Sequence, residues 1–187
     1  MSGRLVLLTG GARSGKSRHA EALASSLGER VLYVATAGVG DREMRRRVEE
    51  HRRRRPPSWE TLEARRDVAS RLAGLGELPP VVLLDCLSLL VSNALLDEAA
   101  RCGEGPELEG AASRAVEEEL SGLLGWHEAA GGHLIVVSNE VGWGVVPPYR
   151  LGRIYRDLLG GANQRLAARA DRVVLMVAGL PLEVKRP

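Results

Sequence analysis

The most constraining feature of this 187-residue chain is a phosphate-loop motif close to its start. Residues Gly10-Gly11-Ala12-Arg13-Ser14-Gly15-Lys16-Ser17 match the pattern G-x-x-x-x-G-K-[ST] at every fixed position. The motif follows the apolar run 5–8 and opens the segment 14–27, which has apolar side chains at helical spacing. A strand, a glycine-rich loop and a helix in this order direct backbone N–H groups toward phosphate oxygens. We therefore expect these eight residues to bind a nucleotide, with Lys16 on the outer phosphates and Ser17 on Mg²⁺.

Predicted strands and helices alternate along the rest of the chain. Buried strands are predicted by the apolar runs at 31–35, 81–84, 134–137 and 173–177, and a shorter candidate strand lies at 59–62. We expect the run 173–177 to be the last strand of the chain. Helices are predicted over 41–54, 68–75, from 87 onward, 111–129 and 149–168. This alternation is typical of an α/β, P-loop NTPase-like fold, with helices on both faces of a mostly parallel sheet. No linker divides the chain, so we expect residues 1–187 to form one nucleotide-binding domain.

Composition and targeting signals point to a soluble cytoplasmic protein. The longest apolar stretch, 81–96, is broken by Asp85 and three other polar residues, whereas a membrane span needs about 20 apolar residues. The N-terminus has no secretory signal pattern, and Cys86 and Cys102 have no metal-ligand spacing. Aromatic residues make up only 3 % of the chain, so stacking platforms for nucleic acid are scarce.

Polar residues follow two of the predicted strands. Asp85 comes directly after the strand 81–84, where phosphate-loop proteins place an acid that holds Mg²⁺. An aspartate there can instead cap the following helix, but the upstream phosphate loop favours a metal role. Asn139 and Glu140 follow the strand 134–137, and a glycine-rich loop containing Trp143 comes next. Ligands bind at the carboxyl ends of parallel strands, so this segment is a candidate substrate site. The alternative is an ordinary connecting loop.

Charge is concentrated in two segments, although the net charge is only +2. Residues 45–55 hold seven arginines against two glutamates, whereas residues 97–119 carry a net charge of −6. On a helix, Arg47 and Arg55 would lie one turn before and after His51. Positive neighbours favour the neutral, nucleophilic imidazole, which suits attack on phosphorus. From the residues alone we favour the simpler interpretation, a solvated basic helix in which His51 has no chemical role.

The chain as a whole resembles the bifunctional adenosylcobinamide kinase / adenosylcobinamide-phosphate guanylyltransferase family of cobalamin biosynthesis. The resemblance rests on TGGARSGKSRHAE at 9–21, YVAT at 33–36, Glu43 to His51, NEVGWGVVP at 139–147 and NQRLAARAD at 163–171. The extended phosphate-loop string and the NEVGxGxVP string together are specific to this family, whereas a phosphate loop alone is not. Glu50 stands where the family often has a second histidine, so His51 is the only candidate of that kind.

This resemblance implies two reactions on a corrinoid substrate. ATP or GTP first phosphorylates the hydroxyl of adenosylcobinamide. GMP is then transferred from GTP to that phosphate through a guanylylated histidine, which gives adenosylcobinamide-GDP and pyrophosphate. The resemblance also implies a homo-oligomer, expected to be a trimer.

By position, His51 is the implied nucleophile, which reverses the simpler interpretation above. Lys16 is the second catalytic candidate. Asn139, Glu140 and Trp143 are the candidate substrate contacts, and Glu140 is one candidate for the base of the kinase step. The nucleotide-contacting positions implied beside the phosphate loop are Thr36, Ala37, Arg52, Arg53, Arg54, Arg55, Glu63 and Asp85.

Two other functions remain open at this point. A phosphate-loop kinase acting on another small alcohol would leave His51 idle. A non-catalytic nucleotide switch would use the arginine-rich segment to bind a partner.

Overall fold

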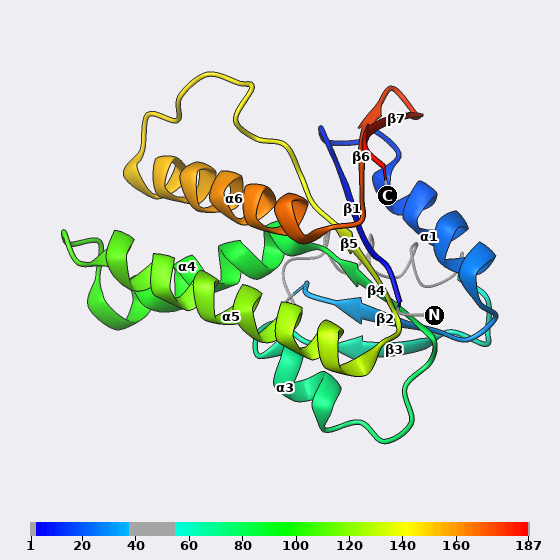
Figure 1. Ribbon diagram of the computed structural model, residues 1–187. Helices are drawn as coiled ribbons and strands as arrows, with labels where there is room; N and C mark the ends of the chain where they lie inside the picture. Colours follow the sequence, from blue (N-terminus) through cyan, green and yellow to red (C-terminus); the bar gives the residue numbers. More distant parts are fainter. Residues whose placement is uncertain (1–2, 38–54, 187) are drawn as a thin grey trace.

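The computed structural model describes residues 3–37 and 55–186 (Figure 1). The predicted helix over 41–54, with His51 and Arg52 to Arg54, lies outside these residues. The strands are β1 (Leu5–Gly10), β2 (Val31–Ala35), β3 (Glu60–Glu63), β4 (Val81–Asp85), β5 (His133–Val137), β6 (Arg172–Val177) and β7 (Leu180–Lys185). The helices are α1 (Lys16–Leu27), α3 (Val68–Ala73), α4 (Leu87–Cys102), α5 (Leu108–Ala130) and α6 (Arg150–Arg169).

The strands form one sheet in the order β3-β2-β4-β5-β1-β6-β7. Strands β1 to β6 run parallel to one another, and β7 alone pairs antiparallel, with β6. The phosphate-loop strand β1 lies between β5 and β6. Since parallel strands end at the same edge, the residues that follow β1, β4 and β5 gather there.

The central strands are apolar throughout because both faces of the sheet are covered. Every residue of β1 and β2 is buried. Helix α1 packs on one face, and α4, α5 and α6 cover the other (Figure 1). Burial on both faces explains why these strands appear in the sequence as continuous apolar runs rather than as alternating patterns.

The predicted α/β class with a mostly parallel sheet is confirmed, and strand 31–35 matches β2 residue for residue. Helix α1 begins at Lys16 rather than at residue 14, because Gly15 before it has a left-handed conformation (φ 93°) that cannot be part of an α-helix. Helix α5 begins three residues before the predicted start at 111. No helix among the described residues is long and apolar enough to cross a membrane.

The prediction that 173–177 is the last strand is wrong, because β7 follows it. A two-residue turn at Ala178 and Gly179, both with positive φ (51° and 85°), joins the two strands. These are the conformations of a tight hairpin turn. The sequence signal was weak because β7 is an exposed edge strand that contains Pro181 and Glu183.

Candidate active site

The phosphate loop, residues 10–17, connects β1 to α1 at the carboxyl edge of the sheet. Gly10 has a φ of 145° and Gly15 a φ of 93°, conformations that side chains disfavour. A Cβ atom on Gly10 would lie only 2.4 Å from the carbonyl oxygen of Met176 on the neighbouring strand. Among the described residues, the buried hydroxyl oxygen of Ser14 has no hydrogen-bond partner. A buried hydroxyl left unpaired inside this loop is suited to a phosphate oxygen.

Lys16 is a buried cation in the same loop, with only 7 % of its surface exposed. Its Nζ donates hydrogen bonds to the carbonyl oxygens of Gly10 (2.9 Å) and Gly11 (2.6 Å). Burial lowers the pKa of Lys16, and the neighbouring Cys86 and Asp85 act in the opposite direction. The ammonium group is therefore held against the loop backbone, where an anionic ligand would meet it.

Asp85 ends β4 at the same edge, two strands away from the phosphate-loop strand. Its Oδ2 accepts a hydrogen bond from the Tyr33 hydroxyl of β2 at 3.0 Å. Burial, and then the charge of Asp85, raise the pKa of Tyr33, so the phenol stays protonated and can donate. The oxygens of Asp85 and Ser17 are the hard ligands that Mg²⁺ prefers. Among residues 3–37 and 55–186, no cluster of three His, Cys, Asp or Glu side chains could hold a metal ion.

Thr36 joins the end of β2 to the start of α4. Its hydroxyl accepts a hydrogen bond from the Cys86 amide (2.8 Å) and donates one to the Cys86 carbonyl (2.7 Å). Its own carbonyl accepts from Asn93 Nδ2 at 2.9 Å, and its amide donates to the Asp85 carbonyl. The fully buried Thr36 therefore holds the backbone just after Asp85: its side chain bonds both backbone groups of Cys86, and its amide bonds the Asp85 carbonyl.

Arg55 and Glu63 lie on the β3 side of the site. The Arg55 guanidinium stacks 3.8 Å above the centre of the Tyr33 ring, and its Nη1 donates to Thr61. Tyr33 therefore contacts Arg55 through its ring and Asp85 through its hydroxyl. Glu63 is exposed at the carboxyl end of β3. A pocket of about 490 Å³ opens between α1 and the residues that precede β3, and this volume is within the range of small-molecule sites. It is lined by Arg18, Glu21, Ala22, Ser25, Arg55, Pro56 and Trp59.

The residues after β5 lie beside the phosphate loop. The backbone amide of Glu140 donates to the Gly10 carbonyl at 3.0 Å, the same oxygen that accepts from Lys16. The side-chain amide of Asn139 donates to the Ser88 hydroxyl at the start of α4, at 2.7 Å. The sheet topology thus brings Asn139 and Glu140 to the edge that carries the phosphate loop and Asp85.

Sequence reasoning assigned no role to three residues that tie this edge together: Thr9, Ser88 and Asn163. Thr9 and Asn163 both donate hydrogen bonds to Glu140, and Ser88 accepts from Asn139. Two of them do occur in the strings that support the family resemblance, Thr9 at the start of TGGARSGKSRHAE and Asn163 at the start of NQRLAARAD. For Thr9 and Asn163, their place in these strings was the available sequence signal, and it did not indicate which residues they contact.

Trp143 lies in the loop between β5 and α6 and is 76 % exposed. Val145, Val146 and Tyr149 of the same loop are exposed as well. The loop is braced at its end, where Arg153 Nη1 donates to the carbonyls of residues 147 and 148. The loop that follows Asn139 and Glu140 therefore exposes several apolar side chains.

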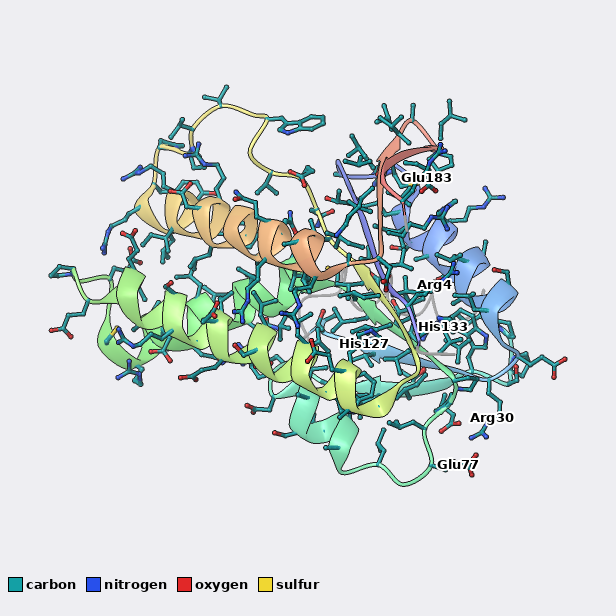
Figure 2. The ribbon with its side chains drawn as sticks, viewed as in Figure 1. Arg4, Arg30, Glu77, His127, His133 and Glu183 are labelled. Atoms are coloured by element: carbon teal, nitrogen blue, oxygen red, sulfur yellow. The ribbon has the colours of Figure 1, made fainter. Side chains whose placement is uncertain are left out.

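Two histidines lie at the opposite, amino-terminal edge of the sheet (Figure 2). His133 begins β5, and its Nδ1 accepts a hydrogen bond from the Arg4 amide at 3.1 Å. His127 is in the last turn of α5, and its Nδ1 is buried with no hydrogen-bond partner among the described residues. Burial lowers the pKa of His127. Both rings are at the far end of the strands from the phosphate loop.

Comparison with solved structures identifies the fold. The chain is similar to an ATPase from the type III secretion system of pathogenic bacteria, with a TM-score of 0.57 and 16 % identity over 93 % of this chain and 52 % of that one. It is also similar to the flagellar accessory protein FlaH of Methanocaldococcus jannaschii, with a TM-score of 0.50 and 13 % identity over 99 % of this chain and 79 % of that one. These likenesses show the P-loop NTPase fold and confirm the predicted fold class.

Sequence comparison identifies closer relatives. The bifunctional adenosylcobalamin biosynthesis protein CobU of Salmonella typhimurium is 40 % identical over 97 % of this chain and 99 % of its own length. The bifunctional adenosylcobalamin biosynthesis protein CobP of Pseudomonas aeruginosa is 45 % identical over 96 % of both chains. A family model for cobinamide kinase / cobinamide phosphate guanyltransferase matches residues 6–184. Together with the phosphate loop and the polar strand ends, this match shows that the chain belongs to the cobinamide kinase / cobinamide phosphate guanyltransferase family.

Proposed function

We propose that this protein carries out both reactions of its family. In the first, the γ-phosphate of ATP or GTP is transferred to the hydroxyl of adenosylcobinamide. In the second, GMP is transferred from GTP to adenosylcobinamide phosphate, which yields adenosylcobinamide-GDP and pyrophosphate. The observation that carries this proposal is a complete phosphate loop inside a family match over residues 6–184, with Lys16 buried and the Ser14 hydroxyl without a hydrogen-bond partner among the described residues.

The kinase step depends on positioning and electrostatics. Amides of residues 10–17 and the Lys16 ammonium group bind the phosphates and offset the charge that develops during transfer. Mg²⁺ held by the Ser17 hydroxyl and the Asp85 carboxylate would neutralise further phosphate charge. Thr36 and Tyr33 position Asp85, and Arg55 and Glu63 provide the other nucleotide contacts proposed from the described residues. Asn139, Glu140 and Trp143 face the substrate.

The guanylyl step proceeds through His51. Its neutral imidazole attacks the α-phosphorus of GTP, the P–N bond forms, and the bond to the β-phosphate breaks to release pyrophosphate. An oxygen of adenosylcobinamide phosphate then attacks the same phosphorus and frees the histidine. Arg52, Arg53, Arg54 and Arg55 offset the developing negative charge.

The test is incubation with Mg²⁺ and GTP labelled at the α-phosphate, without corrinoid, followed by denaturation. Wild type should retain label that is acid-labile and base-stable, as a phosphoramidate is, and His51→Ala should retain none. The matched control is His133→Gln, which alters a histidine at the opposite edge of the sheet and should label normally. His51→Ala should still phosphorylate cobinamide. An active, GTP-binding wild type that takes up no label would leave only a phosphate-loop kinase.

We also propose that the protein is a cytoplasmic homo-oligomer, a trimer, in which His51 of one subunit meets the phosphate loop of a neighbour. Homogeneous Lys16→Ala and His51→Ala oligomers should both fail to take up the α-phosphate label. Mixed oligomers of the two variants should take it up, on the subunit that retains His51. If subunit exchange is verified and mixed oligomers stay unlabelled, the site lies within one subunit.

A further inference from the structure

The side-chain amide of Asn163 contacts three consecutive residues at the end of β5. Asn163 lies on α6 and is 8 % exposed. Its Oδ1 accepts a hydrogen bond from the Ser138 hydroxyl at 2.5 Å. Its Nδ2 donates to the Asn139 carbonyl at 3.0 Å and to Glu140 Oε1 at 3.3 Å. One buried amide thus orients the whole strand end that faces the phosphate loop.

Glu140 has a second neutral donor and a fixed backbone. The Thr9 hydroxyl of β1 donates to Oε1 at 2.9 Å. The Glu140 amide is bonded to the Gly10 carbonyl, which also accepts from Lys16. The carboxylate is therefore held beside the first residue of the phosphate loop, and both of its side-chain donors contact the same oxygen.

The partners of Glu140 differ from those of Asp85 in charge. Within residues 3–37 and 55–186, no arginine or lysine forms an ion pair with Glu140. Asp85, in contrast, interacts electrostatically with Lys16 and accepts from Tyr33. A general base has to be fixed in position before it can meet the proton it removes, and these neutral donors fix the Glu140 carboxylate in one orientation.

We propose that Glu140 is the general base of the kinase step and that Asn163 and Thr9 are its positioning residues. This assignment rests on the proposed function. The substrate hydroxyl oxygen attacks the γ-phosphorus, and its proton passes to the Glu140 carboxylate. The new P–O bond forms as the bond between the γ-phosphorus and the β–γ bridging oxygen breaks, and the nucleoside diphosphate leaves.

The two reactions differ in their need for this base. The acceptor in the first step is an alcohol, which must lose a proton. The acceptor in the second step is a phosphate that is already ionised, so no proton has to be removed. Loss of the Glu140 carboxylate should therefore separate the two activities.

Glu140→Gln is the first test, because it keeps the size of the side chain and an oxygen that can accept from Thr9 and Asn163. Its kinase kcat with ATP and cobinamide should fall by about 10²–10⁴-fold, the usual contribution of a general base. Uptake of the α-phosphate label without corrinoid should be unchanged, and guanylyl transfer to ready-made adenosylcobinamide phosphate should fall far less than the kinase step. Equal rates for Glu140→Gln and wild type in the kinase assay would overturn the proposal, as would equal loss of both steps.

Asn163→Asp tests positioning separately from packing. The substitution keeps the volume of the side chain and an acceptor for Ser138, but it removes both N–H donors and places a carboxylate against Glu140. We expect kcat of the kinase step to fall at least as far as in Asn163→Ala, with KM for ATP unchanged. A packing role predicts the reverse order, with Asn163→Ala the more damaged variant, and would overturn the assignment.

The matched control is Gln164→Glu, the same amide-to-carboxylate change at the adjacent, exposed position of α6. It should leave both activities unchanged. Wild type that phosphorylates no cobinamide would refute the proposed function itself. Active wild type with an active Glu140→Gln variant would refute only the role of Glu140.

Discussion

Replacing Glu119 should cost this protein a substantial part of its stability. Glu119 lies on α5, and only 6 % of its side chain is exposed. Its carboxylate accepts hydrogen bonds from Arg66 Nε (2.8 Å), the Asp67 amide (2.8 Å) and the Val68 amide (3.4 Å). The last two amides belong to the start of α3, where the first N–H groups have no partner within the helix. Glu119 thus fixes the segment that links β3 to α3.

The magnitude follows from the groups that Glu119→Ala would leave unpaired. Removing one partner of a buried ion pair costs about 3–5 kcal/mol. Arg66 is 21 % exposed and has a second partner, Asp97, at 3.3 Å, so water and Asp97 reduce the loss. We expect the free energy of unfolding to fall by about 2–3 kcal/mol. For a chain of this length that corresponds to a decrease in Tm of about 5–10 °C.

The assay is thermal unfolding followed by circular dichroism, with urea unfolding as the second measurement. Glu118→Ala is the matched control, because Glu118 is the preceding residue of the same helix and is exposed. It should change the free energy of unfolding by less than about 0.5 kcal/mol. Glu119→Gln keeps an acceptor oxygen and should fall between the two. Equal Tm values for the Glu119→Ala and Glu118→Ala variants would refute the reasoning.

Three further predictions concern the phosphate loop and the opposite edge of the sheet. Lys16→Ala should reduce kinase kcat by about 10²–10³-fold, whereas Lys185→Ala, at the exposed β7, should leave it unchanged in the same assay. Gly10→Ala should destabilise the fold by about 1–3 kcal/mol, since its Cβ would meet a backbone oxygen, and Gly11→Ala, with open space around it, should not; urea unfolding distinguishes them. The folded-state pKa of His127 is depressed, so the unfolded state binds the extra proton and stability should decline as pH falls below about 6.5. Tm measured against pH should decline less in His127→Gln, and an identical decline would contradict this account.

The sequence by itself determined the features that depend on residues close to one another along the chain. The phosphate loop follows from glycines, Lys16 and Ser17 at fixed spacing between a strand and a helix. The parallel sheet follows from apolar runs that alternate with helices, because strands covered on both faces are apolar at every position. The family resemblance, confirmed by the match over residues 6–184, also needed only the order of the residues.

The tertiary structure decided which distant side chains meet. Tyr33 contacts Asp85 because β2 lies beside β4 in the sheet, and Asn163 contacts residues 138–140 because α6 folds back onto the end of the strand that precedes it. The sequence did not reveal strand β7, because an exposed edge strand need not be apolar on both faces and so leaves no continuous apolar run. Periodicity reports how much of each segment is buried, but it carries no information on which segments lie side by side. The partners of Glu140, and with them the candidate base, therefore came from the packing of α6 against the ends of β1 and β5.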